Sequence, residues 1–225
     1  KFKNINLDSK KKLKRIDRID VDLVNNNDQI SQLNIKRKKS NYSINGKIFD
    51  GAKILDRILF SKSEGNFFDV FEKLNSKISI NFNTIYITNE DYLTSFKADI
   101  IVNNNQLKDL ILSSQFSTKE DLKLSIKTNS NNERITDLFA GNAKPLVKKY
   151  DFIKGFDGGY LKLDSIEKNK VSNSNLKIFD FKLKEVPALT KLLTLASLQG
   201  IADLLTGEGI RFNEFEMIFT SKDGL

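Results

Sequence analysis

The sequence predicts a mainly β protein with a few helices. Three observations lead to this fold class. Apolar and polar residues alternate in most runs of the chain, as they do in strands with one buried face. The runs recur about every ten residues, which suits an antiparallel meander. Asn-rich clusters at 103–105 and 129–132 stand between them as turns. With 225 residues, 39% of them hydrophobic, the chain can form one or two domains with a sizeable core.

The predicted strands follow one another along most of the chain. The first carries Ile19, Val21 and Leu23, and the next is centred on Gly46 with Tyr42, Ile44 and Ile48 on one face. The run from 78 to 87 changes the phase of its alternation after Phe82, as a β-bulge would. The predicted apolar positions of the strands that follow Gly46 are Ile78, Ile80 and Phe82; Phe96, Ala98, Ile100 and Val102; Leu110, Leu112 and Phe116; Leu122, Leu124 and Ile126; Leu161 and Leu163; and Leu176 and Ile178.

Helices are predicted to interrupt the sheet. One lies near 50–60, where Asp50 can cap it, and a second lies near 65–75, with Phe67, Phe68, Phe71 and Leu74 on one face. A short helix over 142–150 has Pro145 close to its first turn. The longest runs over 187–205, between Pro187 and Gly207. Its predicted apolar face consists of Leu189, Leu192, Leu193, Ala196, Ile201 and Leu205. Lys191 and Asp203 on this helix argue against a membrane span.

The composition excludes several classes of site. The chain has no Cys and no His, so it has no disulfides, no thiolate or imidazole metal ligands and no histidine base. Carboxylate and lysine chemistry remain possible, but we expect no enzyme and no cofactor. The net charge is +8, and residues 1–40 hold twelve Lys or Arg against five Asp. We attribute part of this basicity to a coding bias, because Asn, Ile and Lys are all abundant.

Four local patterns have a functional and a structural interpretation. Asp157-Gly158-Gly159 could form a phosphate loop, but no Walker spacing follows it, so a tight turn is the better interpretation. Asp17, Asp20 and Asp22 could hold a hard cation, although a solvated face is favoured. The basic clusters at 10–18 and 36–39 could contact phosphates. Since Phe2 is the one aromatic residue among the first 40, a solvated or lipid-headgroup-facing surface is favoured over nucleic acid.

The apolar strand faces also leave two interpretations open. They could form the closed core of an ordinary sandwich, or a curved sheet whose apolar face stays open to acyl chains. Composition does not separate the two.

The last third of the chain carries a longer pattern. It begins with Gly155-Phe156-Asp157-Gly158-Gly159-Tyr160-Leu161 and continues in a strand with Leu176, Ile178, Asp180 and Phe181. Val186-Pro187-Ala188-Leu189, a Leu-rich run over 192–198, Gly200-Ile201, Gly207-Glu208-Gly209-Ile210, Phe212 and a final Asp223-Gly224 follow. This order resembles the C-terminal region of the AsmA-like family, in particular its large YhdP-type members in bacterial envelopes. The resemblance covers residues 135–225 well and residues 1–134 only in style.

The resemblance implies a long, twisted antiparallel sheet curled into an apolar gutter, as in bridge-like lipid transfer proteins. The strand positions given above from Ile78 to Ile178, other than Phe116, would then line a groove for phospholipid acyl chains, and the 187–205 helix would cover its end or guide lipid. The expected setting is the periplasmic portion of an inner-membrane-anchored protein of a Gram-negative-type bacterium. Through the rest of its chain, such a protein would reach the inner and outer membranes. No nucleic acid partner is expected, and other envelope proteins are possible partners.

Two further expectations complete the interpretation. The chain begins at Lys1 without Met, so we expect it to be a piece of a longer protein. The alternative function is a structural or assembly factor for outer-membrane proteins that acts through its sheet edges.

Overall fold

The predicted fold class is confirmed: the protein is mainly β. The computed structural model describes residues 2–24, 30–52, 68–150, 153–184 and 209–222. Its elements are β1 (Phe2–Lys3), β2 (Asn6–Leu7), β3 (Leu13–Arg15), β4 (Arg18–Val24), β5 (Ile30–Lys38), β6 (Asn41–Asp50), β7 (Ser76–Tyr86), β8 (Tyr92–Asn103), β9 (Gln106–Phe116), β10 (Asp121–Thr128), β11 (Arg134–Ala140), α2 (Lys144–Tyr150), β12 (Phe156–Lys168), β13 (Val171–Leu183) and β14 (Ile210–Lys222).

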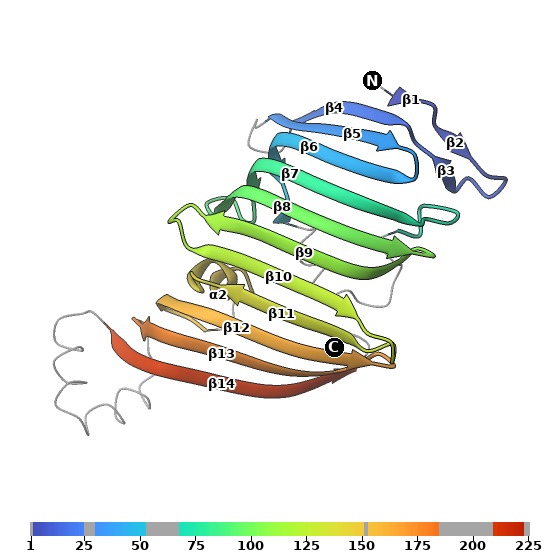
Figure 1. Cartoon of the computed structure of the whole chain (residues 1–225). Helices are drawn as coiled ribbons and strands as arrows, with labels where there is room; N and C mark the ends of the chain where they lie inside the picture. Colours follow the sequence, from blue (N-terminus) through green and yellow to red (C-terminus); the bar gives the residue numbers. More distant parts are fainter. Residues whose placement is uncertain (1, 25–29, 53–67, 151–152, 185–208, 223–225) are drawn as a thin grey trace.

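One long, twisted sheet contains most of the described chain (Figure 1). Its twelve strands follow the chain order from β1 through β4 to β14, and β2 and β3 form a separate small hairpin. Neighbouring strands are antiparallel except β6 and β7, which are parallel. Parallel neighbours need a long crossover, and residues 51–75 connect this pair. The sheet is therefore mixed at this point, whereas the sequence predicted an antiparallel arrangement throughout.

The Asn clusters lie in the turns between strands, where the backbone adopts positive φ. Asn104 and Asn105 both have positive φ between β8 and β9, and Asn169 and Lys170 do so between β12 and β13. Two-residue hairpin loops with this geometry match the twist of the flanking strands, and Asn tolerates positive φ better than most residues. The turns predicted at 103–105 and 129–132 are confirmed.

The predicted phase change in β7 is present, but the bulge itself lies in the neighbouring strand. Phe82 and Ile85 are both buried, so the buried face changes parity between them. The β7–β8 register stays continuous. It is the β8–β9 register that shifts between Thr94 and Lys97, around Ser95 with φ 53°. The change of parity in β7 thus lies beside an irregularity in β8.

The short helix predicted over 142–150 is confirmed as α2. The described part of the 65–75 prediction is wrong, because residues 68–75 form turns and an isolated bridge between Phe71 and Leu13. The Leu13 N–H donates to the Val70 carbonyl at 2.8 Å, so this carbonyl pairs with β3 of the small hairpin rather than within a helix. Most of the helix predicted near 50–60 and all of that over 187–205 lie outside the described residues.

The boundary between residues 134 and 135, from which the sequence pattern resembles the AsmA-like family well, does not separate two parts of the sheet. Arg134 and Ile135 are consecutive residues of β11, which pairs with β10 on one side and β12 on the other. The better-matched C-terminal region and the rest of the chain thus share one continuous sheet.

Candidate functional site

The strand registers bring all sixteen predicted lining residues onto one face of the sheet. Residues directly opposite each other on neighbouring strands share a face, and alternate residues along a strand do so where the strand is regular. We call the face that carries Ile80, Leu124 and Leu163 the apolar face, and its opposite the polar face. The predicted positions on the apolar face are Ile78, Ile80, Phe82, Phe96, Ala98, Ile100, Val102, Leu110, Leu112, Leu122, Leu124, Ile126, Leu161, Leu163, Leu176 and Ile178.

One line of paired residues crosses the apolar face without a polar member. We call it the apolar row, and it joins one residue from each strand from β4 to β14. In order it is Ile19, Ile35, Ile44, Ile80, Ala98, Leu112, Leu124, Leu138, Leu163, Leu176 and Met217. Such a line requires every strand to be in register, because a slip of one residue would bring polar side chains onto this face.

The next residue along each strand points to the polar face, and the residues at these positions are mostly polar or charged. The corresponding line there is Asn81, Lys97, Ser113, Lys123, Phe139, Lys162, Lys177 and Glu216. Lys177 lies 3.3 Å from Glu214 and 3.1 Å from Glu216, and hydrogen bonds with these carboxylates raise its pKa. Apart from Phe139 this line is polar, so the sheet is amphipathic from β7 to β14.

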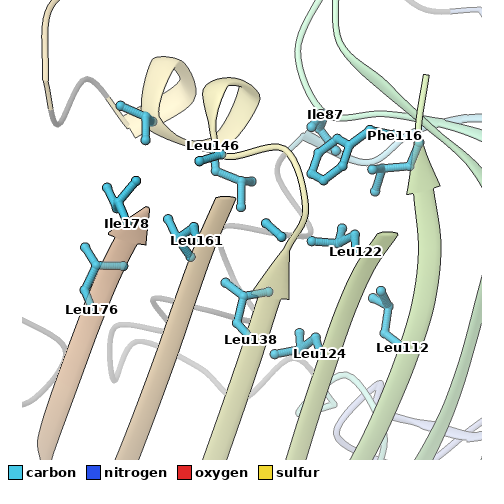
Figure 2. Packing of buried hydrophobic residues seen from close by; sticks show 14 of the residues in the cluster. Ile87, Leu112, Phe116, Leu122, Leu124, Leu138, Leu146, Leu161, Leu176 and Ile178 are labelled. Atoms are coloured by element: carbon cyan, nitrogen blue, oxygen red, sulfur yellow. The ribbon is translucent and has the colours of Figure 1, made fainter. Parts of the chain in front are cut away.

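The apolar face is largely filled by its own side chains. Ile126 and Ile178 are 0% exposed, and most predicted lining residues are buried in one cluster. Figure 2 shows Leu112, Leu124, Leu138 and Leu176, from four strands, in one band of this cluster. Residues that retain some exposure and pack against the cluster are Ile80, Phe96, Ile100, Leu107, Ile153, Leu163, Leu183, Phe212, Phe215 and Phe219. A side chain without exposed surface cannot touch a ligand unless it moves, so ligand contacts would belong to this second group.

Two segments pack onto the apolar face near its strand ends. Helix α2 contributes the buried Leu146 and Val147, and Ala143, just before the helix, is buried with them. Leu146 faces the strands in Figure 2. Over β7 and β8, Phe68 and Leu74 pack with Ile78 and Val102 in a second cluster. Of the phenylalanines predicted on a helix, Phe68 and Phe71 therefore do reach the core, although the backbone that carries these two is not helical.

The Asp157-Gly158-Gly159 segment has a structural role in this arrangement. It lies inside β12 rather than in a turn between strands, although both glycines have positive φ as expected. The Asp157 carboxylate accepts hydrogen bonds from Lys144 of α2 and Lys184 after β13, both at 2.7 Å. These bonds lower the pKa of Asp157 to about 2. A carboxylate held this way ties α2 to the sheet.

Two of the three N-terminal aspartates, Asp17 and Asp20, are likewise bonded to protein groups. Asp17 accepts hydrogen bonds from Arg15 at 2.6 Å and Asn4 at 2.9 Å, which lower its pKa to about 2. Asp20 bonds with Arg18 and Asn34. Among the described residues, no group of three or more Asp or Glu side chains is placed to hold a metal ion. In that same part of the chain, no helix has the length and hydropathy needed to cross a membrane.

Two shallow hollows lie on the polar face. The first, of about 440 Å³, is bordered by polar side chains of β4, β5 and β6, including Asp22, Gln32 and Lys47. The second, of about 360 Å³, lies over β9–β12 between Ile111, Lys123 and Phe139. Both are open and bordered by mixed side chains, so neither gathers groups for a specific chemistry.

Sequence reasoning missed part of the apolar face. β5 was hidden by the basic cluster at 36–39, and β11 and β14 were not recognised. Leu33 and Ile35 alternate with Gln32 and Asn34, and Phe215 and Met217 alternate with Glu214 and Glu216, so the period-two signal was present. The residues that these strands add are Leu138, Ala140, Ile210, Phe212, Phe215 and Phe219.

Comparison with known proteins finds no relative of this chain. No protein-family model matches the chain, and no curated protein or solved structure is significantly similar to it. The AsmA-like resemblance therefore rests on the sequence pattern alone.

Proposed function

We propose that this chain is a non-enzymatic, lipid-conducting segment of an AsmA-like envelope protein. In this proposal, phospholipid acyl chains lie along the apolar face and move across the strands between the inner and outer membranes. The observation that carries the proposal is the apolar row, which crosses eleven strands without a polar residue.

The energetics favour such a path. Each CH₂ group exposed to water costs about 0.8 kcal/mol, so an acyl chain needs continuous apolar contact to move without a large barrier. A single pocket would bind a lipid but would also hold it. The apolar row offers equivalent contacts at about 4.8 Å intervals from strand to strand. The half-buried side chains Ile80, Phe96, Leu163 and Phe215 would supply the accessible contacts.

The test is to place a photo-crosslinking phenylalanine analogue at single positions and identify the lipid attached after irradiation. Phe96 and Phe215 report on the apolar face, and Phe179 is the matched control, since it stacks on Tyr160 at 4.8 Å on the polar face. We expect phospholipid adducts at Phe96 and Phe215 and none at Phe179. If the folded chain carries no lipid adduct at Phe96 or Phe215, the apolar face is a closed core and the proposal fails.

The assembly-factor alternative has one supporting observation. β14 is a 13-residue strand that pairs with β13 and, within the described residues, with no other strand. A long strand edge can add a strand from a partner. Capture of unfolded outer-membrane protein by a chain that carries no phospholipid would favour this function over lipid conduction.

A further inference from the structure

One corner of the apolar face is polar. On the apolar face of β11–β14, one line of residues lies two positions from the apolar row, on the side of the β12–β13 turn. These paired residues are Thr136, Ser165, Ser174 and Phe219. The line beyond it is Arg134, Glu167, Ser172 and Ser221. On β7–β10 the same positions stay largely apolar, with Ile78, Ile100, Leu110 and Ile126. We call the polar residues of the first two lines the polar corner: Thr136, Ser165, Ser174, Arg134, Glu167, Ser172 and Ser221.

The polar corner combines two opposite charges with a set of hydroxyls. Arg134 Nη1 lies 3.7 Å from Glu167 Oε2, and their side chains are 26% and 41% exposed. The Ser165 and Ser174 hydroxyls are 2.8 Å apart, as are those of Ser172 and Ser221. Both serine pairs share a face with the two charges. Ser165 and Ser174 lie next to Leu163 and Leu176 of the apolar row, and Ser172 and Ser221 lie one line further out.

This placement has an energetic cost, because the two charges lie on the face of the sheet that is otherwise apolar. Charged side chains are usually kept on the solvated face of a sheet, as Lys177 and Glu216 are here. Burial lowers the pKa of Arg134, and the Glu167 carboxylate partly offsets that effect. An arginine remains protonated at neutral pH even so, so a guanidinium charge stays at the edge of the apolar face. A ligand that is apolar at one end and charged at the other would complement both.

We propose that the polar corner binds the headgroup of a zwitterionic, amine-bearing phospholipid whose acyl chains lie along the apolar row. This inference rests on the proposed function and adds a headgroup site to it. The Arg134 guanidinium is suited to a phosphodiester, because it can donate two parallel hydrogen bonds. The Glu167 carboxylate accepts hydrogen bonds from the ammonium group, and the serine hydroxyls serve the ester oxygens. The pair thus presents one charge of each sign, as the headgroup does.

The experiment measures binding of three lipids with identical acyl chains by native mass spectrometry. The probes are phosphatidylethanolamine, phosphatidylglycerol and diacylglycerol, which have a zwitterionic, an anionic and no charged headgroup. The variants are Arg134→Gln and Glu167→Gln, with Lys162→Gln as the control, because Lys162 lies on the polar face of the same strand as Glu167. Free glycerophosphoethanolamine tests whether the headgroup alone is enough.

We expect the unaltered chain to prefer phosphatidylethanolamine over diacylglycerol by about tenfold, the effect of one charge-assisted hydrogen bond. Arg134→Gln should remove most of that preference and leave diacylglycerol binding unchanged. Glu167→Gln should selectively reduce the preference for phosphatidylethanolamine over phosphatidylglycerol, and Lys162→Gln should do neither.

Several results would overturn the headgroup site while leaving the proposed function intact. Equal binding of all three lipids would show that the corner is a solvated rim, and an equal loss of every lipid in Arg134→Gln would show a structural role. Binding of glycerophosphoethanolamine as tight as that of the lipid would point to a soluble ligand instead. If the unaltered chain binds no lipid at all, the proposed function itself fails, and the headgroup site fails with it.

Discussion

Two adjacent glycines allow β12 and β13 to change which residues face the core. Gly158 and Gly159 have φ of 74° and 73°, and Asp180 on β13 has φ 53° close by. On the side of the glycines toward the β12–β13 turn, Leu161 and Ile178 are buried, and on the other side Phe156 and Phe181 are buried. In both strands the buried positions therefore change from one alternate set of residues to the other at this point. The stacked Phe156 and Phe181 rings, 5.1 Å apart, then reach the core near α2.

The two glycines predict different costs of substitution. A Cβ at Gly159 would lie 2.6 Å from the Phe179 carbonyl oxygen and 2.8 Å from Phe181 Cβ, whereas at Gly158 the nearest atom is 3.8 Å away. Gly158→Ala should lower the free energy of unfolding by about 1–3 kcal/mol through backbone strain alone. Gly159→Ala should lower it further, because the sheet must also open. Urea denaturation of both variants checks this, and equal midpoints would contradict the packing argument.

At the scale of elements, α2 is attached to the sheet by packing and by charge. Its apolar side is buried in the main cluster. Its first residue, Lys144, bonds with Asp157 of β12 and follows Asn142, whose side chain accepts a hydrogen bond from the Lys144 N–H at 3.2 Å. In its last turn, Lys149 donates to the Ala52 carbonyl at 2.9 Å. The helix is therefore held at both ends.

The Asp157 contacts make part of the stability depend on pH. The pKa of Asp157 is lowered from 3.8 to about 2 in the folded chain. Its stabilising effect is therefore complete above about pH 4 and is lost as the pH falls toward 2. Asp157→Asn should lower the melting temperature at pH 6 and leave it almost unchanged at pH 2. The exposed Asp164, in the same strand, provides the control substitution Asp164→Asn. An equal effect of Asp157→Asn at both pH values would show that the carboxylate charge does not hold the helix.

The elements also show how far the sequence alone could lead. Alternation within a strand identified β4, β6–β10, β12 and β13, because that signal is local. It could not reveal the parallel pairing of β6 and β7, which depends on where residues 51–75 return the chain. Nor could it reveal the polar corner, since Arg134, Glu167 and Ser172 become neighbours only through the register of three strands. The apolar positions were predictable, but whether they are open or filled depends on tertiary packing.

At the scale of the whole molecule, the sheet has a centre of stability rather than a uniform core. The main cluster draws its buried residues from β8–β13, from α2 and Ala143 before it, and from Ile87 after β7, while β14 packs partly buried phenylalanines against it. On β4–β6, the members of the apolar row, Ile19, Ile35 and Ile44, are only half-buried. Each strand bonds mainly with its immediate neighbours, so the edge strands depend on the central ones for their order.

This gradient predicts the order in which backbone amides exchange with deuterium. Amides with few buried apolar neighbours open through low-energy local fluctuations, whereas those beneath a fully packed cluster need more global unfolding. Peptides from β4 and β5 should exchange first, and those from β9, β10 and β12 last, when followed by mass spectrometry. Leu122→Ala, a substitution of a 2% exposed cluster residue, should cost about 2–5 kcal/mol. It should therefore accelerate exchange in β9–β12 while leaving β4 almost unchanged. Acceleration of equal size in β4 would mean that the sheet unfolds as one cooperative unit, and the gradient would then be a feature of packing without consequence for stability.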